Sequence, residues 1–258
     1  MKIALVGYGK MGHMLEIAAK SLGHEVVVTI DSYADDASVK VSTTKGIVEA
    51  VKNSGAEGII EFTHPSSVIE NIKALVPLKL PLVIGTTGWY DKLEDVKKLV
   101  KAENSSLFYS PNYSIGVNMF YKMVEHASSL MSQYSEYDCA IWEAHHNQKA
   151  DSPSGTALAV AKSVMAGNPS KTEMVFDAFH KKPEPQQLHV SSTRCGSIPG
   201  THKVFFDSPA DTIEITHQAR SREGFAMGAV RCLNWLDAGI NDGFLNVGNV
   251  YTMKDFLG

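Results

Sequence analysis

The stretch 143–157 contains the side chains of this sequence that are best suited to acid–base chemistry. It reads Glu-Ala-His-His-Asn-Gln-Lys-Ala-Asp-Ser-Pro-Ser-Gly-Thr-Ala. His145 and Lys149 are candidate proton-transfer groups, because an imidazole titrates near neutral pH and a lysine ammonium can donate a proton. Residues 154–156 open a helix-favouring sequence, and the amides at a helix start bind carboxylate or phosphate groups. The stretch therefore predicts anion recognition and proton transfer in one place.

Two simpler explanations for this stretch are a metal site and purely structural roles. A metal site would use His145, His146 and Asp151 as ligands. The two histidines are adjacent, however, whereas zinc sites commonly space their histidines apart and add a clear third ligand. We therefore expect no metal. Adjacent histidines also occur as ordinary core or surface residues. Ser154 would serve as a helix cap in either case, and capping is compatible with ligand binding.

A glycine-rich turn near the N-terminus predicts a nucleotide-binding element. Residues 3–6 form a short apolar run that ends at Gly7-Tyr-Gly-Lys-Met-Gly12, and apolar residues then recur at helical spacing up to Gly23. A second predicted strand, 25–30, ends at Asp31, about 20 residues beyond the glycines. In a dinucleotide fold this acid binds a ribose hydroxyl. The alternative is a glycine turn that only joins packed elements.

The alternation of strands and helices continues to about residue 114. Further strands are predicted at 58–63, 82–84 and 106–109, with helices around 67–75 and 92–101 between them. This order favours a parallel sheet with helices on both faces. Ligands bind beyond the carboxyl ends of such strands, so the segments 63–66, 85–88 and 110–114 are the expected cofactor rim.

The remainder of the chain changes character and predicts a second, α+β domain. Helices are expected at 117–131 and from about 156, and strands at 137–142, 188–193, 201–206 and 212–218. The helical pattern at 224–236 is expected to pack back on the first domain. We therefore predict a Rossmann-type doubly wound parallel sheet with a second α+β domain. The expected boundaries are 1–116 for dinucleotide binding, 117–221 for substrate binding and oligomerisation, and 222–258 for the returning helical segment.

Charge and cysteine content narrow the class of partner. The 258 residues include 24 Lys and Arg against 28 Asp and Glu, a net charge of -4, which gives no reason to expect nucleic acid or a membrane as partner. A small-molecule ligand is expected. Three unpaired cysteines and the lack of a signal pattern indicate a cytoplasmic protein. Arg194 and Arg222 are expected in surface ion pairs, although either could reach a carboxylate.

Five motifs are distributed along the chain, at 7–12, 85–88, 112–118, 143–156 and 225–229. In order and spacing they resemble the 4-hydroxy-tetrahydrodipicolinate reductase (dihydrodipicolinate reductase) family over essentially the whole chain. The segment from the paired histidines to Ser-Gly-Thr is highly specific, whereas many dehydrogenases share the glycine turn.

The resemblance implies both a reaction and a set of site residues. NADH or NADPH would reduce (2S,4S)-4-hydroxy-2,3,4,5-tetrahydrodipicolinate, a cyclic imine dicarboxylate, to tetrahydrodipicolinate with loss of water, in lysine and diaminopimelate synthesis. A homotetramer joined through the central sheet is implied, with His145 and Lys149 as catalytic residues. The implied substrate-binding residues are His146, Ser154, Gly155 and Thr156, and the implied cofactor-binding residues are Gly7, Tyr8, Gly9, Lys10, Met11, Gly12, Asp31, Gly85, Thr86, Thr87, Ser110, Pro111, Asn112 and Tyr113.

The sequence departs from the family pattern near the cofactor. Lys10 stands where many members have Arg, and Ser32 stands where some have a basic residue; Tyr113 replaces a common Phe. Asp31 would repel a 2′-phosphate, so NADH is expected to serve at least as well as NADPH. Another dehydrogenase would share only the cofactor half, and a dinucleotide-sensing regulatory module would bind without turnover. The combined histidine–lysine and Ser-Gly-Thr motif favours the reductase.

Overall fold

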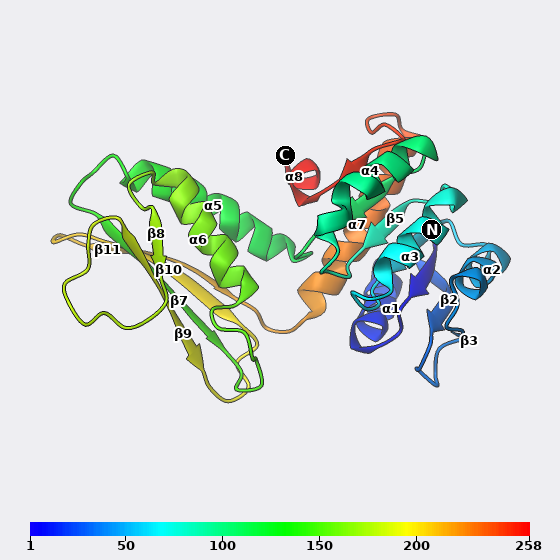
Figure 1. The fold of residues 1–258 in the computed structure, drawn as a ribbon, viewed down its shortest axis with the longest axis horizontal. Helices are drawn as coiled ribbons and strands as arrows, with labels where there is room; N and C mark the ends of the chain where they lie inside the picture. Colours follow the sequence, from blue (N-terminus) through cyan, green and yellow to red (C-terminus); the bar gives the residue numbers. More distant parts are fainter. The chain divides into compact units, whose positions relative to one another are not determined.

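The computed structural model describes all 258 residues, which form two compact units (Figure 1). The first unit contains residues 1–114 and 223–258, and the second contains residues 115–222. The chain therefore leaves the first unit once and returns to it with its C-terminal segment. No helix combines the length and apolar character that crossing a bilayer requires.

The first unit is built on a seven-stranded sheet in which all neighbouring strands are parallel. Its order is β12-β6-β5-β4-β1-β2-β3, so the order reverses between β1 and β4. The central strands are almost uninterrupted runs of buried apolar residues, as expected for strands covered on both faces. The doubly wound fold is thus confirmed. The strands are β1 (Lys2–Val6), β2 (Glu25–Asp31), β3 (Val39–Lys40), β4 (Gly58–Glu61), β5 (Leu82–Ile84), β6 (Leu107–Tyr109) and β12 (Val250–Tyr251).

Helices cover both faces of this sheet (Figure 1). One core cluster joins α2, α3 and α4 to the strands, while α1 and α7 pack against each other and against β1, β2 and β4–β6. Burial of an apolar stripe on each helix stabilises this arrangement. The helices are α1 (Lys10–Ser21), α2 (Thr44–Ser54), α3 (Val68–Leu75), α4 (Leu93–Ala102), α7 (Glu223–Asn241) and α8 (Met253–Leu257), with short 3₁₀ turns at Val76–Leu78 and Tyr90–Lys92.

Several short elements of the first unit are absent from the sequence-based prediction. Helix α2 buries only Ile47 and Val51, so its apolar pattern is weak, although Thr43 caps its start and Gly55, with φ 69°, ends it. Strands β3 and β12 have two residues each, too few to show a period. Neighbouring strands, rather than local sequence, decide whether such segments become strands.

Phe62 explains two of the glycines near the strand ends. Gly7 has φ 95°, and a Cβ atom there would lie 2.0 Å from the carbonyl oxygen of Phe62. A Cβ atom at Gly85 would lie 1.9 Å from the Phe62 ring. Only glycine permits both the positive φ at residue 7 and these close approaches. Phe62 therefore packs directly against the residues that follow β1 and β5.

The second unit is a five-stranded mixed sheet with two helices on one face (Figure 1). Its order is β11-β10-β7-β9-β8, with β7, β8 and β9 parallel and β10 antiparallel to both of its neighbours. Helices α5 (Ile115–Met131) and α6 (Gly155–Gly167) enclose a core with the sheet. The strands are β7 (Asp138–His145), β8 (Glu173–Val175), β9 (Gln187–Arg194), β10 (Thr201–Asp207) and β11 (Thr212–Gln218).

The register of this sheet concentrates polar residues around the end of β7. Strand β7 extends to His145, three residues further than predicted, and its inward-facing positions include Glu143 and His145. Glu143 pairs with Ser192 on β9 and with His202 on β10. Paired residues of adjacent strands project to the same face, so the register places these three side chains together.

Candidate active site

A cleft of about 350 Å³ lies beside the carboxyl ends of β1, β4 and β5 in the first unit. The strand order reverses between β1 and β4, and open α/β sheets bind ligands at such a switch point. The structure therefore brings three predicted cofactor segments, 7–12, 63–66 and 85–88, to one place. The lining residues are Gly9, Lys10, Met11, Phe62, Thr63, Pro65, Gly85, Thr86 and Thr87.

Asp31 holds the glycine turn against the loop that follows β2. Its carboxylate accepts the N–H groups of Tyr8 at 2.7 Å, Tyr33 at 2.7 Å and Ala34 at 3.0 Å. Burial raises the pKa of Asp31, but hydrogen bonds from these amides outweigh it and leave the pKa below its usual value. The predicted ribose-binding acid is thus an ionised carboxylate whose position is fixed by main-chain donors.

Other predicted cofactor residues make mainly internal contacts. Tyr8 stacks on His13 with ring centroids 4.2 Å apart, and its hydroxyl donates to Glu16. Tyr113 is buried, and its hydroxyl donates to the Ile84 carbonyl at 2.7 Å. The segment 110–113 does not line the cleft. Its role toward a cofactor remains a prediction from the family resemblance.

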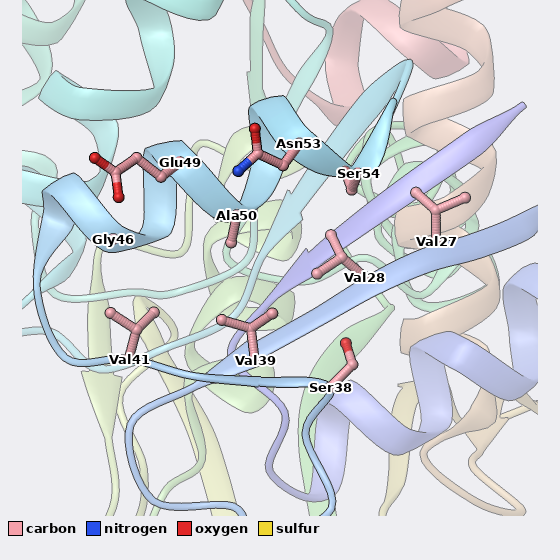
Figure 2. Close-up of a pocket in the computed structure, with 10 residues that line it drawn as sticks. All are labelled: Val27, Val28, Ser38, Val39, Val41, Gly46, Glu49, Ala50, Asn53 and Ser54. Atoms are coloured by element: carbon pink, nitrogen blue, oxygen red, sulfur yellow. The ribbon is translucent and has the colours of Figure 1, made fainter.

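A second hollow of the first unit lies beside α2 and is lined differently (Figure 2). Val28, Val39 and Val41 project into it, and Glu49 and other polar side chains lie on α2. None of the predicted site residues lines this groove. The cleft at the strand ends, rather than this larger groove, fits the glycine turn and is the candidate cofactor site.

The second unit is organised around the buried carboxylate of Glu143. This carboxylate accepts the Ser154 N–H at 3.0 Å, the Ser192 hydroxyl at 2.8 Å and the Arg194 guanidinium at 2.9 Å. The Ser154 hydroxyl also donates to it, and His202 Nε2 lies 3.4 Å away. Burial raises the pKa of Glu143, but His202, Ser154, Arg194 and Ser192 together hold it far below its usual range. Glu143 is therefore an ionised group in the interior.

His145 lies next to this carboxylate and is itself buried. Its Nδ1 is 3.4 Å from Glu143 Oε2, and its ring is 5.0 Å from that of His202. Burial lowers the pKa of His145 to about 4; Glu143 opposes this shift, while His202, Lys149 and Arg194 add to it. The imidazole is therefore neutral at pH 7, and it is suited to accept or relay a proton.

Lys149 occupies the more exposed rim of the same cluster. Its Nζ lies 2.7 Å and 3.0 Å from the two carboxylate oxygens of Asp151. Lys149, with smaller contributions from amides including that of Gly155, lowers the pKa of Asp151. Arg194 donates to the Asp151 carbonyl as well as to Glu143. The arginine therefore ties the lysine-bearing loop to the buried carboxylate.

The start of α6 completes this site. Ser154 is the N-cap, and its hydroxyl oxygen accepts the Ala157 N–H at 3.1 Å. Gly155 is exposed and Thr156 is half-buried. The positive end of the helix dipole therefore lies in the same loop as Lys149, and both favour an anion. His146, the fourth predicted substrate contact, follows β7 and is half-buried.

Glu143, His145 and His202 also form a possible metal-ligand set. Their ligand atoms lie within 4.8 Å of one another. The Arg194 guanidinium is 2.9 Å from the Glu143 carboxylate, however, so a divalent cation would meet a second positive charge at close range. We therefore assign no metal to the cluster.

The sequence-based interpretation misses much of this network. Ser192 and His202 are not identified there, and Glu143 is only part of a motif. Arg194 is expected in a surface ion pair or in contact with a carboxylate; the surface pair is wrong, because its partner is the buried carboxylate of Glu143. One signal is present in the sequence: Glu143 follows Cys139 and Ile141 at alternate positions, so period-two alternation places a carboxylate on an apolar face. Its partners Ser192, Arg194 and His202 lie on other strands, so the sequence around Glu143 does not identify them.

The fold and the first cleft together define a class of protein. A doubly wound sheet, a glycine turn after β1, an acid at the end of β2 and a cleft at the switch point are the features of an NAD(P)-dependent oxidoreductase. Residues 1–113 match the family description "Dihydrodipicolinate reductase, N-terminus", and residues 116–257 match "Dihydrodipicolinate reductase, C-terminus". The chain belongs to the dihydrodipicolinate reductase family.

Individual relatives cover the chain from end to end. The 4-hydroxy-tetrahydrodipicolinate reductase of Archaeoglobus fulgidus is 36% identical over 270 residues, which cover 100% of both chains. That of Christiangramia forsetii is 32% identical over 257 residues, 100% of this chain and 98% of the relative. A dipicolinate-bound dihydrodipicolinate reductase from Paenisporosarcina sp. TG-14 has the same fold, with a TM-score of 0.75 at 20% identity over 98% of this chain and 97% of that one.

The lowered pKa of His145 predicts how stability responds to acid. Between pH 6.5, where an unfolded histidine takes up a proton, and about pH 4, the unfolded state binds more protons than the folded state. The free energy of unfolding should therefore fall as pH decreases through this window, by about 2 kcal/mol from His145. Urea unfolding at pH 7, 6 and 5 should show a shallower decline for His145→Gln.

The exposed His126 on α5 provides the control. His126→Gln should keep the wild-type dependence on pH. Equal slopes for wild type and His145→Gln would contradict a buried neutral imidazole at residue 145.

Proposed function

We propose that the protein uses NAD(P)H to reduce 4-hydroxy-tetrahydrodipicolinate to tetrahydrodipicolinate with loss of water, and that residues 143–156 bind the substrate and transfer the proton. The observation that carries this proposal is the placement of Lys149, neutral His145 and the start of α6 around one buried carboxylate. A cyclic imine dicarboxylate needs anion-binding groups and a proton donor. The dipicolinate bound to the Paenisporosarcina structure is a ring dicarboxylate of this kind.

The cofactor is assigned to the cleft of the first unit. Bound NAD(P)H supplies a hydride to the electron-poor carbon of the substrate. The glycine turn from Gly7 to Gly12 offers backbone amides to a pyrophosphate, and Asp31 offers a carboxylate to ribose hydroxyls. Gly85, Thr86 and Thr87 also line the cleft.

Proton transfer is assigned chiefly to Lys149. As hydride adds, negative charge shifts towards the ring nitrogen, and a cationic donor stabilises that charge while supplying the proton. His145 is neutral at pH 7 because burial lowers its pKa to about 4, so it is the weaker donor and the better acceptor or relay. Ser154, Gly155 and Thr156 present the start of α6 to a substrate carboxylate, with His146 beside them.

Assembly as a homotetramer is proposed through the second unit, which is also assigned substrate binding. Helices α5 and α6 cover one face of its sheet (Figure 1). The other face carries Trp142, Lys203 and Phe205, which are only partly buried within the chain. Such a face is suited to packing against another copy. Small-molecule chemistry of this kind fits a cytoplasmic enzyme without nucleic-acid or membrane partners.

The catalytic assignment predicts a large effect of Lys149→Ala. A positioned proton donor contributes about 10²–10⁴-fold, so kcat should fall by about two orders of magnitude or more while the affinity for NADH is kept. A coupled assay that generates the unstable imine in place, followed by cofactor oxidation, measures this. Lys162→Ala, on the exposed surface of α6, should behave as wild type.

Variants of the carboxylate-binding residues provide the contrast. His146→Ala and Thr156→Val should raise KM more than they lower kcat. Unchanged turnover in Lys149→Ala would exclude its role as proton donor.

Cofactor choice gives a second prediction. Asp31 should repel a 2′-phosphate, so NADH should be used at least as well as NADPH. Asp31→Ser combined with Ser32→Arg removes this charge and supplies a phosphate-binding fork, which should shift the kcat/KM ratio towards NADPH by about tenfold or more. Ser32→Arg alone keeps the amide contacts of Asp31 and should shift the ratio less. If the wild-type protein prefers NADPH, Asp31 does not govern cofactor choice, and other residues bind the 2′-phosphate.

The assembly proposal predicts the mass in solution. Sedimentation equilibrium should give four times the chain mass of 28.1 kDa. Phe205→Glu places a charge on the uncovered sheet face and should lower the mass, whereas Ile17→Glu, at a position 67% exposed on α1, should not. A monomeric wild type would exclude this assembly.

A further inference from the structure

Glu61 is a fully buried carboxyl group at the end of β4, beside the cofactor cleft. Its exposed fraction is 0%, and the preceding β4 residues are apolar. One carboxyl oxygen accepts the Thr63 hydroxyl and the Asn71 amide, the latter at 3.1 Å, and the other accepts the Thr86 hydroxyl at 2.8 Å. Burial raises the pKa of Glu61, and these three donors oppose the shift. Contacts to the loops after β4 and β5 therefore offset only part of the cost of burying this group.

Thr86 is the point where this network meets the cleft. Its hydroxyl oxygen accepts the Thr63 N–H at 2.7 Å while donating to Glu61. Its carbonyl accepts the Trp89 indole N–H at 2.8 Å. Thr63 and Thr86 both line the cleft. Glu61 itself is not among the lining residues, so its influence on a ligand passes through these two threonines.

We propose that Glu61 is a positioning residue for the cofactor, which fixes the cleft wall by holding Thr63 and Thr86 in one hydrogen-bonded arrangement. This inference rests on the proposed function, because it assumes that the cleft binds the nicotinamide cofactor. If the side chain at position 61 only filled space in the core, an apolar residue would do so at a lower free-energy cost, since a buried carboxyl group carries a desolvation cost. The carboxyl group provides acceptors for both loops at once, which an apolar residue cannot do.

The hydroxyl of Thr86 allows a sharp test. Thr86→Ser keeps the hydroxyl and loses a methyl group, whereas Thr86→Val keeps the shape and loses the hydroxyl. Fluorescence titration with NADH, without imine substrate, should give a Kd within about twofold of wild type for Thr86→Ser and about tenfold weaker for Thr86→Val. A packing role would reverse this order. Equal affinities for all three proteins would overturn the proposal.

Glu61→Gln tests the carboxyl group itself, with Glu70→Gln on the exposed side of α3 as the matched control. Glu61→Gln should weaken NADH binding several-fold and Glu70→Gln should not. Because Glu61 acts through Thr86, the double variant Glu61→Gln/Thr86→Val should bind NADH no more weakly than Thr86→Val alone. If the fold-changes of the two single variants multiply in the double variant, the two residues act independently, and that result would contradict the proposal.

Measurements of stability and of turnover distinguish a positioning role of Glu61 from loss of fold and from failure of the proposed function. Thermal unfolding of each variant identifies loss of fold. If Glu61→Gln does not fold, Asn71→Leu takes its place, because it removes one donor to Glu61 at a position outside the cleft lining and should also weaken NADH binding. The KM for the imine, which is assigned to the second unit, should stay unchanged. Wild type that binds NADH without reducing the imine would refute the proposed function, whereas the ranking of NADH affinities tests Glu61 independently of turnover.

Discussion

The candidate active site depends on the requirement that a buried carboxylate must be surrounded by donors. Glu143 is fully buried, and an ionised carboxylate without partners in the interior would cost several kcal/mol. Ser154 from the start of α6 and Ser192 and Arg194 from β9 provide the donors. Satisfying one side chain therefore fixes the positions of a helix start and a neighbouring strand relative to β7.

The same arrangement separates the two groups that we propose for proton transfer by their surroundings. His145 lies inside, where burial and nearby cations hold its imidazole neutral. Lys149 lies on the rim, paired with Asp151. A site that binds dicarboxylates needs positive charge at the rim, while a neutral interior group avoids competing with it. The division of roles that we propose follows from this difference in burial.

A buried carboxyl group also marks the cofactor unit, where Glu61 joins the loops after β4 and β5. Both units thus use an interior acid at the end of a strand to hold polar loop residues. In each unit the acid follows apolar residues on its strand. An acid that follows apolar strand residues therefore indicates a buried polar network in both units.

The sequence by itself determined the local features of this protein. The glycine turn, the longer helices, the central strands and the family were predictable, because glycine φ requirements and apolar periodicity act over a few residues. Only the tertiary structure decided the short elements β3, β8 and β12, the weakly patterned helix α2, and the partners of Glu143. Ser192 and His202 lie 49 and 59 positions from it, and strand register alone makes them neighbours. A shift of one residue would turn these side chains to the opposite face, which no local pattern can specify.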